Sequence, residues 1–417
     1  MKKIEKLLFN FVKNDGLTFI LSFIVFIILL MCFEDTETII DYPVFSSVMI
    51  TLLFQKIIDL LKKTILKKME DKIKLTEDYE SLNKQYSKTD NLITYDNIGT
   101  KYEKWCFKHY KKVKFTFPVC CDYILEDLSV KIKDSKDKYY KAPDYILYNF
   151  DKFISAHRMS TIYNNLNIRV DNWYVKNYEF VMETSRTTYF DSMSTNRVMD
   201  YLLDNDISVR KMYEYGSAIT PLNCSQLSNH LGFNAFVESS DGKILFIKRS
   251  DKVSTGKYTY GSSIGASLKT KYVLNANGEF KIESFGKGIV AEIEDELSIS
   301  ADKIEKIENK DFCVLAAYRD LVEGGKPQLL VYAKSALDSY QISDQFNKTK
   351  KEKSKTMKSD GKKIVWIPKE ELMKITVMPN GIMYNGKFMR MVASTSASLT
   401  IFINYLKKEA KKQGGVI

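Results

Sequence analysis

Histidine, cysteine, proline and glycine are scarce in this 417-residue chain, which contains 3, 6, 7 and 18 of them, respectively. So little proline and glycine excludes collagen-like and low-complexity architectures. Six cysteines are too few for a disulfide scaffold of this length, and none belongs to a C-x-x-C pair of the kind that binds zinc. The three histidines, His109, His157 and His230, are scattered along the chain. The remaining candidate metal ligands are therefore aspartate and glutamate.

The chain has enough apolar residues to bury a core, at 45% hydrophobic and 28% charged. This mixture excludes wholesale disorder, and the length is typical of two or three domains. Lysine and arginine number 63 against 52 aspartates and glutamates, which leaves a net charge of +11. A surplus of this size indicates a polyanionic partner without identifying it.

Two apolar segments near the N-terminus predict a transmembrane helical hairpin over residues 1–69. The first, residues 17–33 (LTFILSFIVFIILLMCF), carries no charge and, at about 1.5 Å per residue, just spans a bilayer's hydrocarbon core. A cleaved signal peptide is the alternative, but the acidic sequence EDTET that follows offers no small-residue cleavage site. The second segment runs from Pro43 to Leu61, and its alternative is an amphipathic helix lying in the membrane interface.

Charge around these segments predicts their orientation. Lysines precede the first segment and follow the second, whereas the loop between them, residues 34–42, carries only acidic charges. The positive-inside rule then places both termini, and everything after about residue 62, in the cytoplasm. Residues 70–94 follow as a helical stalk, because leucine and tyrosine recur there at helical spacing, or as a solvated linker helix.

Residues 95–225 predict an intermediate cytoplasmic α+β region without a motif that specifies a mechanism. The segment NWYVKNYEFVME alternates like a strand, whereas TNRVMDYLLDN has helical spacing. Arg197 and Arg210 are candidate phosphate contacts, since the guanidinium fork matches phosphate geometry. The patch KHYKKVK, residues 108–114, is either a phosphate or lipid contact or a solvated basic face.

The C-terminal part carries an acidic helix between strand candidates. Residues 231–237 and 243–249 predict a hairpin, and residues 312–319, 328–333 and 364–368 predict further strands.

On the helix of residues 283–300, three carboxylates share one face because they stand at i, i+3 and i+4: Glu292, Asp295 and Glu296. Either a hard cation such as Mg²⁺ compensates their repulsion, or they form a solvated face paired with lysines.

This arrangement resembles the Nudix superfamily, whose box reads G-x5-E-x7-R-E-U-x-E-E-x-G-U, where U is aliphatic. Glu283 takes the first glutamate position, and AEIEDELSI, residues 291–299, overlays R-E-U-x-E-E-x-G-U with Asp295 as a conservative substitute. The resemblance implies an α/β/α sandwich with a mixed β-sheet over residues 226–395, followed by a C-terminal helix over 396–417. It also implies that Glu292, Asp295 and Glu296 are ligands of Mg²⁺.

The box departs from the family pattern at several positions. Ala291 and Ser298 replace the family's arginine and glycine, and the nearest counterpart of its first glycine is Gly265. An insertion, KTKYVLNANGEFK, then splits the box, and its NANG sequence predicts a hairpin over the pocket. These departures favour loss of catalysis with retention of a nucleotide-binding pocket, for which no cofactor is required.

The combined parts look like the membrane-bound Nudix effectors of bacterial cyclic-oligonucleotide antiphage systems (CBASS). That resemblance implies a two-pass protein of the bacterial inner membrane. It would bind a cyclic di- or trinucleotide, form a homo-oligomer and disrupt the bilayer, with no DNA or RNA partner. Candidate ligand-binding residues, most of them on the predicted strands, are Lys248, Arg249, Tyr260, Arg319, Arg197 and Arg210.

Two alternatives remain open from the sequence. One is an active membrane-anchored hydrolase that uses Mg²⁺ to cleave nucleoside diphosphate derivatives, with Glu292 and Glu296 holding the metal. The other is a scaffold in which the fold only mediates assembly.

Overall fold

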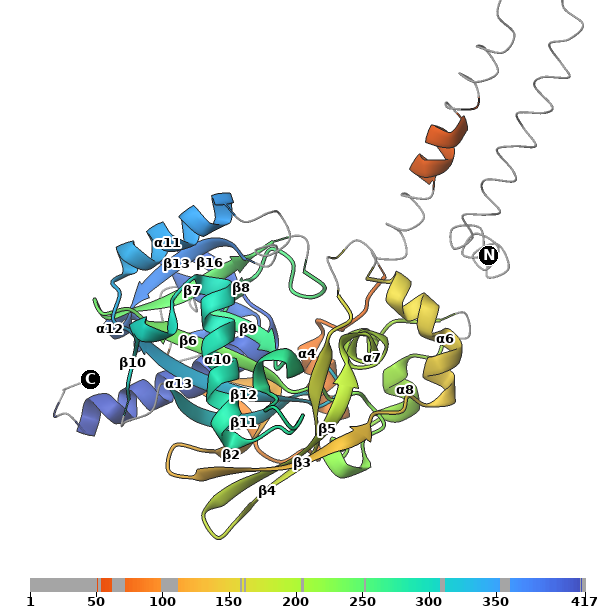
Figure 1. Ribbon diagram of the computed structural model, residues 1–417, viewed down its shortest axis with the longest axis horizontal. Coiled ribbons are helices and arrows are strands. Elements are labelled where there is room, and N and C mark those ends of the chain that lie inside the picture. Colours follow the sequence, from red (N-terminus) through yellow and green to blue (C-terminus); the bar gives the residue numbers. More distant parts are fainter. Residues whose placement is uncertain are drawn as a thin grey trace, which may run out of the picture.

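A computed structural model describes Thr51 and residues 54–61, 72–98, 112–157, 160, 163–203, 206–250, 253–307, 312–352, 361–412 and 414. The described part is a mixed α/β fold built on one ten-stranded sheet and two three-stranded sheets (Figure 1). Its largest unit is a ten-stranded sheet whose main path runs β1-β2-β11-β12-β6-β7-β13. All neighbours on this path are antiparallel except β12 and β6, which are parallel.

The strands of the large sheet come from both sides of residue 225. Three short strands extend it: β8 pairs with β7, β9 with β6 and β10 with β12. Their bounds are β1 Leu92–Ile98, β2 Lys112–Ile124, β6 Gly232–Glu238, β7 Lys243–Arg249, β8 Tyr260–Gly261, β9 Ile264–Ser267, β10 Ile304–Glu305, β11 Cys313–Asp320, β12 Lys326–Ser335 and β13 Gly361–Pro368.

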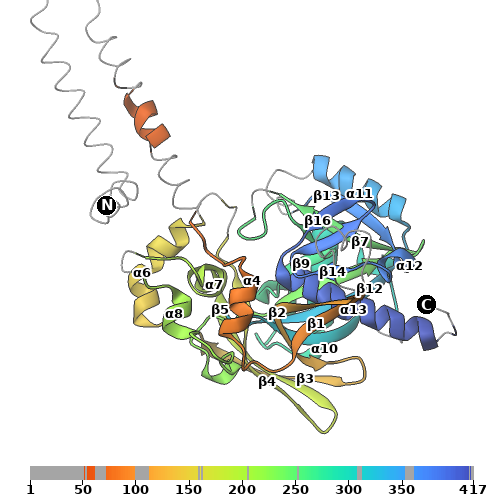
Figure 2. The same cartoon turned by 180° about the vertical axis from the view of Figure 1, so that it is seen from behind.

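Strand β6 shows why helices cover both faces of this sheet. Every residue of β6 is buried, so its alternating side chains enter two different cores. Phe233 and Val237 lie in the core that contains α10 (Ile282–Leu297) and α11 (Ser339–Glu352). Phe236 lies in the opposite core, where its ring stacks 4.7 Å from that of Phe402 on α13 (Ala393–Lys412). Figure 2 shows α13 in front of the sheet, with α10 behind it.

A smaller sheet, β3-β5-β4, packs into the same core as α10. Its strands are β3 Ser129–Tyr139, β4 Leu166–Lys176 and β5 Glu179–Thr188. Its fully buried contributions are Ile168, Val170, Phe180 and Met182. The remaining elements are α4 Tyr79–Gln85, α6 Asp144–Ser155, α7 Tyr189–Ser194, α8 Val209–Tyr213, α9 Thr270–Val273, α12 Lys369–Leu372, β14 Val377–Met378, β15 Gly381–Tyr384, β16 Lys387–Arg390, η1 Asn196–Val198, η2 Leu222–Cys224 and η3 Ala301–Lys303.

The predicted transmembrane hairpin is corrected, and with it the fold class that includes it and the two-pass inner-membrane localisation. Among the residues that the structure describes, no helix is both long and apolar enough to cross a membrane. The first predicted segment, residues 17–33, lies outside the described residues, as do residues 43–50 of the second. The described residues of the second segment are Thr51 and residues 54–61, which are helical and include Lys56 and Asp59.

Helix α13 has the length of a membrane span, at 20 residues, but not its composition. Lysines and a glutamate fill its last turns, and its apolar side chains pack on the large sheet. Helix α13 is therefore part of the core on one face of the large sheet.

Candidate functional site

Helix α10 carries the predicted acidic face, and its apolar residues set the orientation of that face. Ile289, Ile293 and Leu297 stand at i, i+4 and i+8 and are fully buried against the sheet. The helix ends at Ser298, whose left-handed backbone (φ 61°) forms the C-cap. Glu292 precedes Ile293 directly and is itself buried at the edge of this core. A carboxylate in such a place needs a partner that compensates its charge.

Lys269 is that partner. Its Nζ lies 2.9 Å from Oε2 of Glu292, and the side chain of Glu292 is 1% exposed. Lys269 directly follows Leu268, which lies in the same core as Ile289 and Ile293. The ammonium therefore approaches α10 from the chain just after β9, inside the segment that splits the box.

The same segment also covers Asp295. The hydroxyl of Tyr272, on α9, donates a hydrogen bond to Oδ2 of Asp295. The ammonium of Lys271 lies 4.2 Å from the centre of the Tyr272 ring, and that of Lys269 lies 5.5 Å from it. Two lysines and a tyrosine from one short insertion thus surround the acidic face of α10.

Close packing holds α9 against α10. Gly288 of α10 faces Val273 of α9, and a Cβ atom at Gly288 would come within 2.1 Å of Cγ1 of Val273. Glycine is therefore required at this crossing, because any side chain would push the two helices apart.

The protonation of the site follows from burial and from these contacts. Burial raises the pKa of Glu292, and the attraction of Lys269 opposes that rise. The rise prevails because Oε1 of Glu292 is buried and accepts no hydrogen bond from the described residues. Burial alone would lower the pKa of Lys269, but attraction to Glu292, Glu296 and Asp295 outweighs it and raises that pKa. The ammonium therefore stays charged, as the cation of this site.

The predicted Mg²⁺ does not fit these residues as they stand. Among the described residues, no group of three or more histidine, cysteine, aspartate or glutamate side chains is arranged to hold a metal ion. Lys269 already bonds Glu292 and Tyr272 already bonds Asp295, so a divalent cation on these oxygens would lie beside an ammonium. In this arrangement the positive charge beside Glu292 and Asp295 comes from lysines of the chain itself.

The structure brings three of the predicted ligand-binding residues together at one part of the sheet. Lys248 pairs with Tyr260 across β7 and β8, and its Nζ lies 5.4 Å from the centre of the Tyr260 ring. The backbone N–H of Arg249 donates to the carbonyl of Thr259, 2.8 Å away, but its side chain points to the opposite face of the sheet from that of Lys248 and lies near Gly261 and Gly265. Lys248 and Tyr260 are therefore the cation and the ring that share a face, and such a pair can contact phosphate and stack on a base.

Arg197 and Arg210 lie elsewhere, in buried polar contacts within the fold. Arg197 donates to the hydroxyls of Ser254 and Thr255 at 3.0 and 2.8 Å. Arg210 donates to both carboxylate oxygens of Asp200, at 2.6 and 3.0 Å. It also donates to two backbone carbonyls, those of residues 321 and 322, so most of its guanidinium donors are used inside the molecule.

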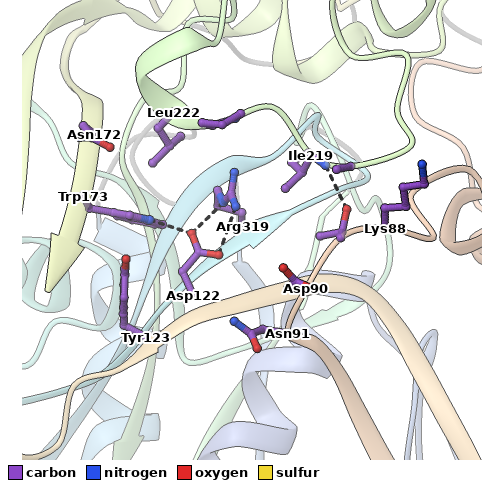
Figure 3. Close-up of a pocket in the computed structure, with 13 residues that line it drawn as sticks. Lys88, Asp90, Asn91, Asp122, Tyr123, Asn172, Trp173, Ile219, Leu222 and Arg319 are labelled. Carbon is purple, nitrogen blue, oxygen red and sulfur yellow. Dashed lines mark hydrogen bonds and ion pairs between the residues drawn. The ribbon is translucent and has the colours of Figure 1, made fainter.

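Arg319, the remaining predicted residue, lines a pocket of about 390 Å³ (Figure 3). Its Nε lies 2.7 Å from Oδ2 of Asp122, its Nη2 lies 3.3 Å from Oδ1, and its Nη1 donates to the carbonyl of Thr220. The indole N–H of Trp173 donates to the same carboxylate at 2.7 Å. The complete lining is Lys88, Thr89, Asp90, Asn91, Asp122, Tyr123, Asn172, Trp173, Ala218, Ile219, Pro221, Leu222 and Arg319.

Sequence reasoning missed four residues that define these two places: Lys269, Tyr272, Asp122 and Trp173. The first two had a usable signal, because the sequence KTKY lies next to an acidic helix in the chain and carries the opposite charge. Asp122 and Trp173 had none, since they belong to different strands and meet only when the two sheets pack together.

Comparisons with known proteins add little to this geometry. No protein-family model and no curated protein matches the chain. Similar solved structures include DR0079 from Deinococcus radiodurans, at 15% identity and a TM-score of 0.22, over 35% of this chain and 70% of that one. A MutT protein from Methanosarcina mazei Go1 aligns at 10% identity and a TM-score of 0.23, over 44% of this chain and 95% of that one. Scores this low carry no argument about function.

Proposed function

We propose that this protein is a Nudix-like sensor that binds a cyclic di- or trinucleotide without hydrolysing it. The contact between Lys269 and Glu292 carries the proposal, because an ammonium from the chain takes the place where a hydrolase needs a metal. A fixed cation cannot generate a hydroxide from bound water, but it does keep the buried acidic helix stable.

The proposed sites of nucleotide contact are Lys248 and Tyr260. The proximity of this ammonium and this ring supports the proposal, since a cation can face a phosphate while a ring stacks on a base. The net charge of +11 favours an anionic ligand over a neutral one.

Binding shifts the protein toward a homo-oligomer, in the role of an effector in a cyclic-oligonucleotide antiphage system. For that shift the nucleotide must bind the assembled form more tightly than the monomer, since equal affinity for both would leave the equilibrium unchanged. The experiment therefore follows binding and assembly in the same titration.

The test titrates the purified full-length chain with cyclic di- and trinucleotides, using calorimetry for binding and light scattering for mass. We expect tight binding with an increase in mass, and about tenfold weaker binding for Lys248→Ala. Lys243→Ala is the matched control, because Lys243 lies at the other end of β7 and its ammonium pairs with Asp241, 2.8 Å away.

A parallel incubation with Mg²⁺ and nucleoside diphosphate derivatives should give no product. Turnover that is lost in Glu296→Gln would overturn the proposal in favour of a Mg²⁺-dependent hydrolase. Oligomers that form without nucleotide, together with no binding, would overturn it in favour of a scaffold.

A further inference from the structure

The pocket around Asp122 and Arg319 lies where the two sheets meet. Its walls come from the loop at 88–91, from β2 and β11 of the large sheet, from β4 of the small sheet, and from residues 218–222. A volume of about 390 Å³ is within the range of sites that hold small molecules. Any occupant would contact both sheets at once.

One wall is aromatic and rigid. Trp173 is held by its hydrogen bond to Asp122, and its ring lies 5.9 Å from that of Phe180. The centre of the Tyr123 ring lies 5.7 Å from that of Phe180, so Phe180 contacts both aromatic rings of the pocket. Figure 3 shows Trp173 and Tyr123 together on one side of the Asp122–Arg319 pair. Such a wall suits a flat, unsaturated ligand, because rings held in place lose little entropy when they stack.

The charges of the pocket cancel. Arg319 is neutralised by Asp122, and the other charged residues of the lining are Lys88 and Asp90, one of each sign. With two cations matched by two anions, the pocket does not concentrate a free phosphate or another strong anion. This distinguishes it from the neighbourhood of Lys248 and Arg249.

Besides the charged groups, the lining holds two amides and the hydroxyls of Tyr123 and Thr89, and the Thr89 hydroxyl accepts a hydrogen bond from the backbone N–H of Ile219. Asn91 and Asn172 stand on different segments, and each amide offers both a donor and an acceptor. A neutral, flat ligand that carries donors and acceptors along its edge matches this set. The bases of nucleotides have that chemistry, whereas sugars lack the flat face and lipids lack the polar edge.

We propose that this pocket binds a nucleobase, stacked on the aromatic wall and hydrogen-bonded by Asn91 and Asn172. The base can belong to a free nucleoside or to a cyclic nucleotide, and the second source rests on the proposed function. In that case the base enters the pocket while the phosphates face cations outside it.

The test uses nucleosides as probes, because they present the base without any phosphate. The full-length chain is titrated with adenosine, guanosine, cytidine and uridine, and separately with cyclic dinucleotides, in calorimetry. Ala218→Trp fills the pocket from an exposed position of its lining. Ala276→Trp, at an exposed turn outside the lining, is the matched control. Asn91→Asp keeps a residue that tolerates the left-handed backbone at this position (φ 57°) but removes the amide donors.

We expect at least one nucleoside to bind the unmodified chain and Ala276→Trp equally, to lose binding in Ala218→Trp, and to bind Asn91→Asp about tenfold more weakly. Unchanged binding in Ala218→Trp, or no nucleoside binding to the unmodified chain at millimolar concentration, would overturn the proposal. Cyclic nucleotide binding that Ala218→Trp leaves intact and Lys248→Ala weakens would exclude the cyclic nucleotide as the source of the base and keep the proposed function. Nucleoside binding that Ala218→Trp abolishes, without any cyclic nucleotide binding, would keep the pocket and reject the proposed function.

Discussion

The ammonium of Lys269 lies 2.9 Å from the buried carboxylate of Glu292, and this contact ties the chain after β9 to α10. Lys269 begins the insertion that splits the acidic motif, and Glu292 lies after it on α10. The side chain of Glu292 is only 1% exposed at this contact. Each residue therefore provides the main compensation for the charge of the other. Removing one partner of such a pair costs more than removing both, because a buried charge is then left alone.

Lys269→Met should therefore lower the free energy of unfolding by about 3 kcal/mol, whereas Lys269→Met combined with Glu292→Gln should recover much of that loss. Urea denaturation at pH 7.5 measures both. The control is Lys271→Met, which removes an exposed lysine of the same insertion and should change stability by less than about 0.5 kcal/mol. If Lys269→Met alone is as stable as the variant that also carries Glu292→Gln, the pairing of Lys269 with Glu292 is contradicted.

The loss of stability in Lys269→Met should also depend on divalent cations. With the ammonium removed, Glu292 and its neighbours Asp295 and Glu296 form an uncompensated acidic face that a hard cation can occupy. We expect 5–10 mM Mg²⁺ or Mn²⁺, about the concentration that saturates a weak oxygen-ligand site, to raise the Tm of the variant and leave that of the unmodified chain unchanged. Equal shifts in both proteins would show that the lysine does not exclude the metal.

Gly288→Ala should destabilise the protein by about 2 kcal/mol, because the new methyl group would overlap Val273 and separate α9 from α10. Gly286→Ala on the same helix is the control: its Cβ would meet Phe312 at 3.3 Å, a contact that a small ring movement relieves. Since alanine is the better helix former, we expect Gly286→Ala to change stability by less than about 1 kcal/mol, in the stabilising direction. Thermal unfolding followed by circular dichroism compares the two variants. Equal Tm values would contradict the close contact between Gly288 of α10 and Val273 of α9.

Arg210 should prove to be a stabilising residue and not a ligand contact. Its side chain is 4% exposed and forms a two-oxygen ion pair with Asp200, so Arg210→Met should cost about 3 kcal/mol. Burial would lower the pKa of this guanidinium, but the bonds to Asp200 reverse that effect and raise it. Lys211→Met, at the exposed neighbouring residue, is the control for stability. A fall in cyclic nucleotide affinity with unchanged stability would restore the predicted role in binding.

Stability should depend on pH through Asp320, which is fully enclosed near Glu323 and Lys326. Burial, with the repulsion of Glu323, raises the pKa of Asp320 to about 7 from its usual 3.8. Between these two values the folded protein holds a proton that the unfolded chain has lost. The contribution of Asp320 to the free energy of unfolding is therefore full below about pH 4 and falls as the pH rises toward 7.

Asp320→Asn should flatten this part of the profile, as measured by urea denaturation from pH 4 to pH 7.5. Asp127→Asn is the control, because the side chain of Asp127 is 88% exposed. The pKa of the neighbouring Glu323 is shifted in the opposite direction. Burial would raise its pKa, but Arg197 and Lys326 outweigh burial and lower it. An unchanged slope in Asp320→Asn would contradict the assignment.

Local elements were predictable because each has a period that the sequence shows directly. The strand predicted at 243–249 is β7, residues 364–368 lie in β13, and the helix predicted over 283–300 is α10 at Ile282–Leu297. The shared face of Glu292, Asp295 and Glu296 also follows from spacing alone. The transmembrane hairpin was predicted from apolar composition, and this prediction is wrong because, among the described residues, no helix is both long and apolar enough to cross a membrane.

By itself, the sequence determined the elements, the register of the acidic helix and the surplus of positive charge, all properties of neighbours along the chain. Only the tertiary structure decided which cation meets Glu292, which arginines are used inside the fold, and where Asp122, Trp173 and Arg319 converge. Those contacts join residues 23 to 197 positions apart. Their formation depends on how two sheets and a helix pack together, and no local pattern of residues records that packing.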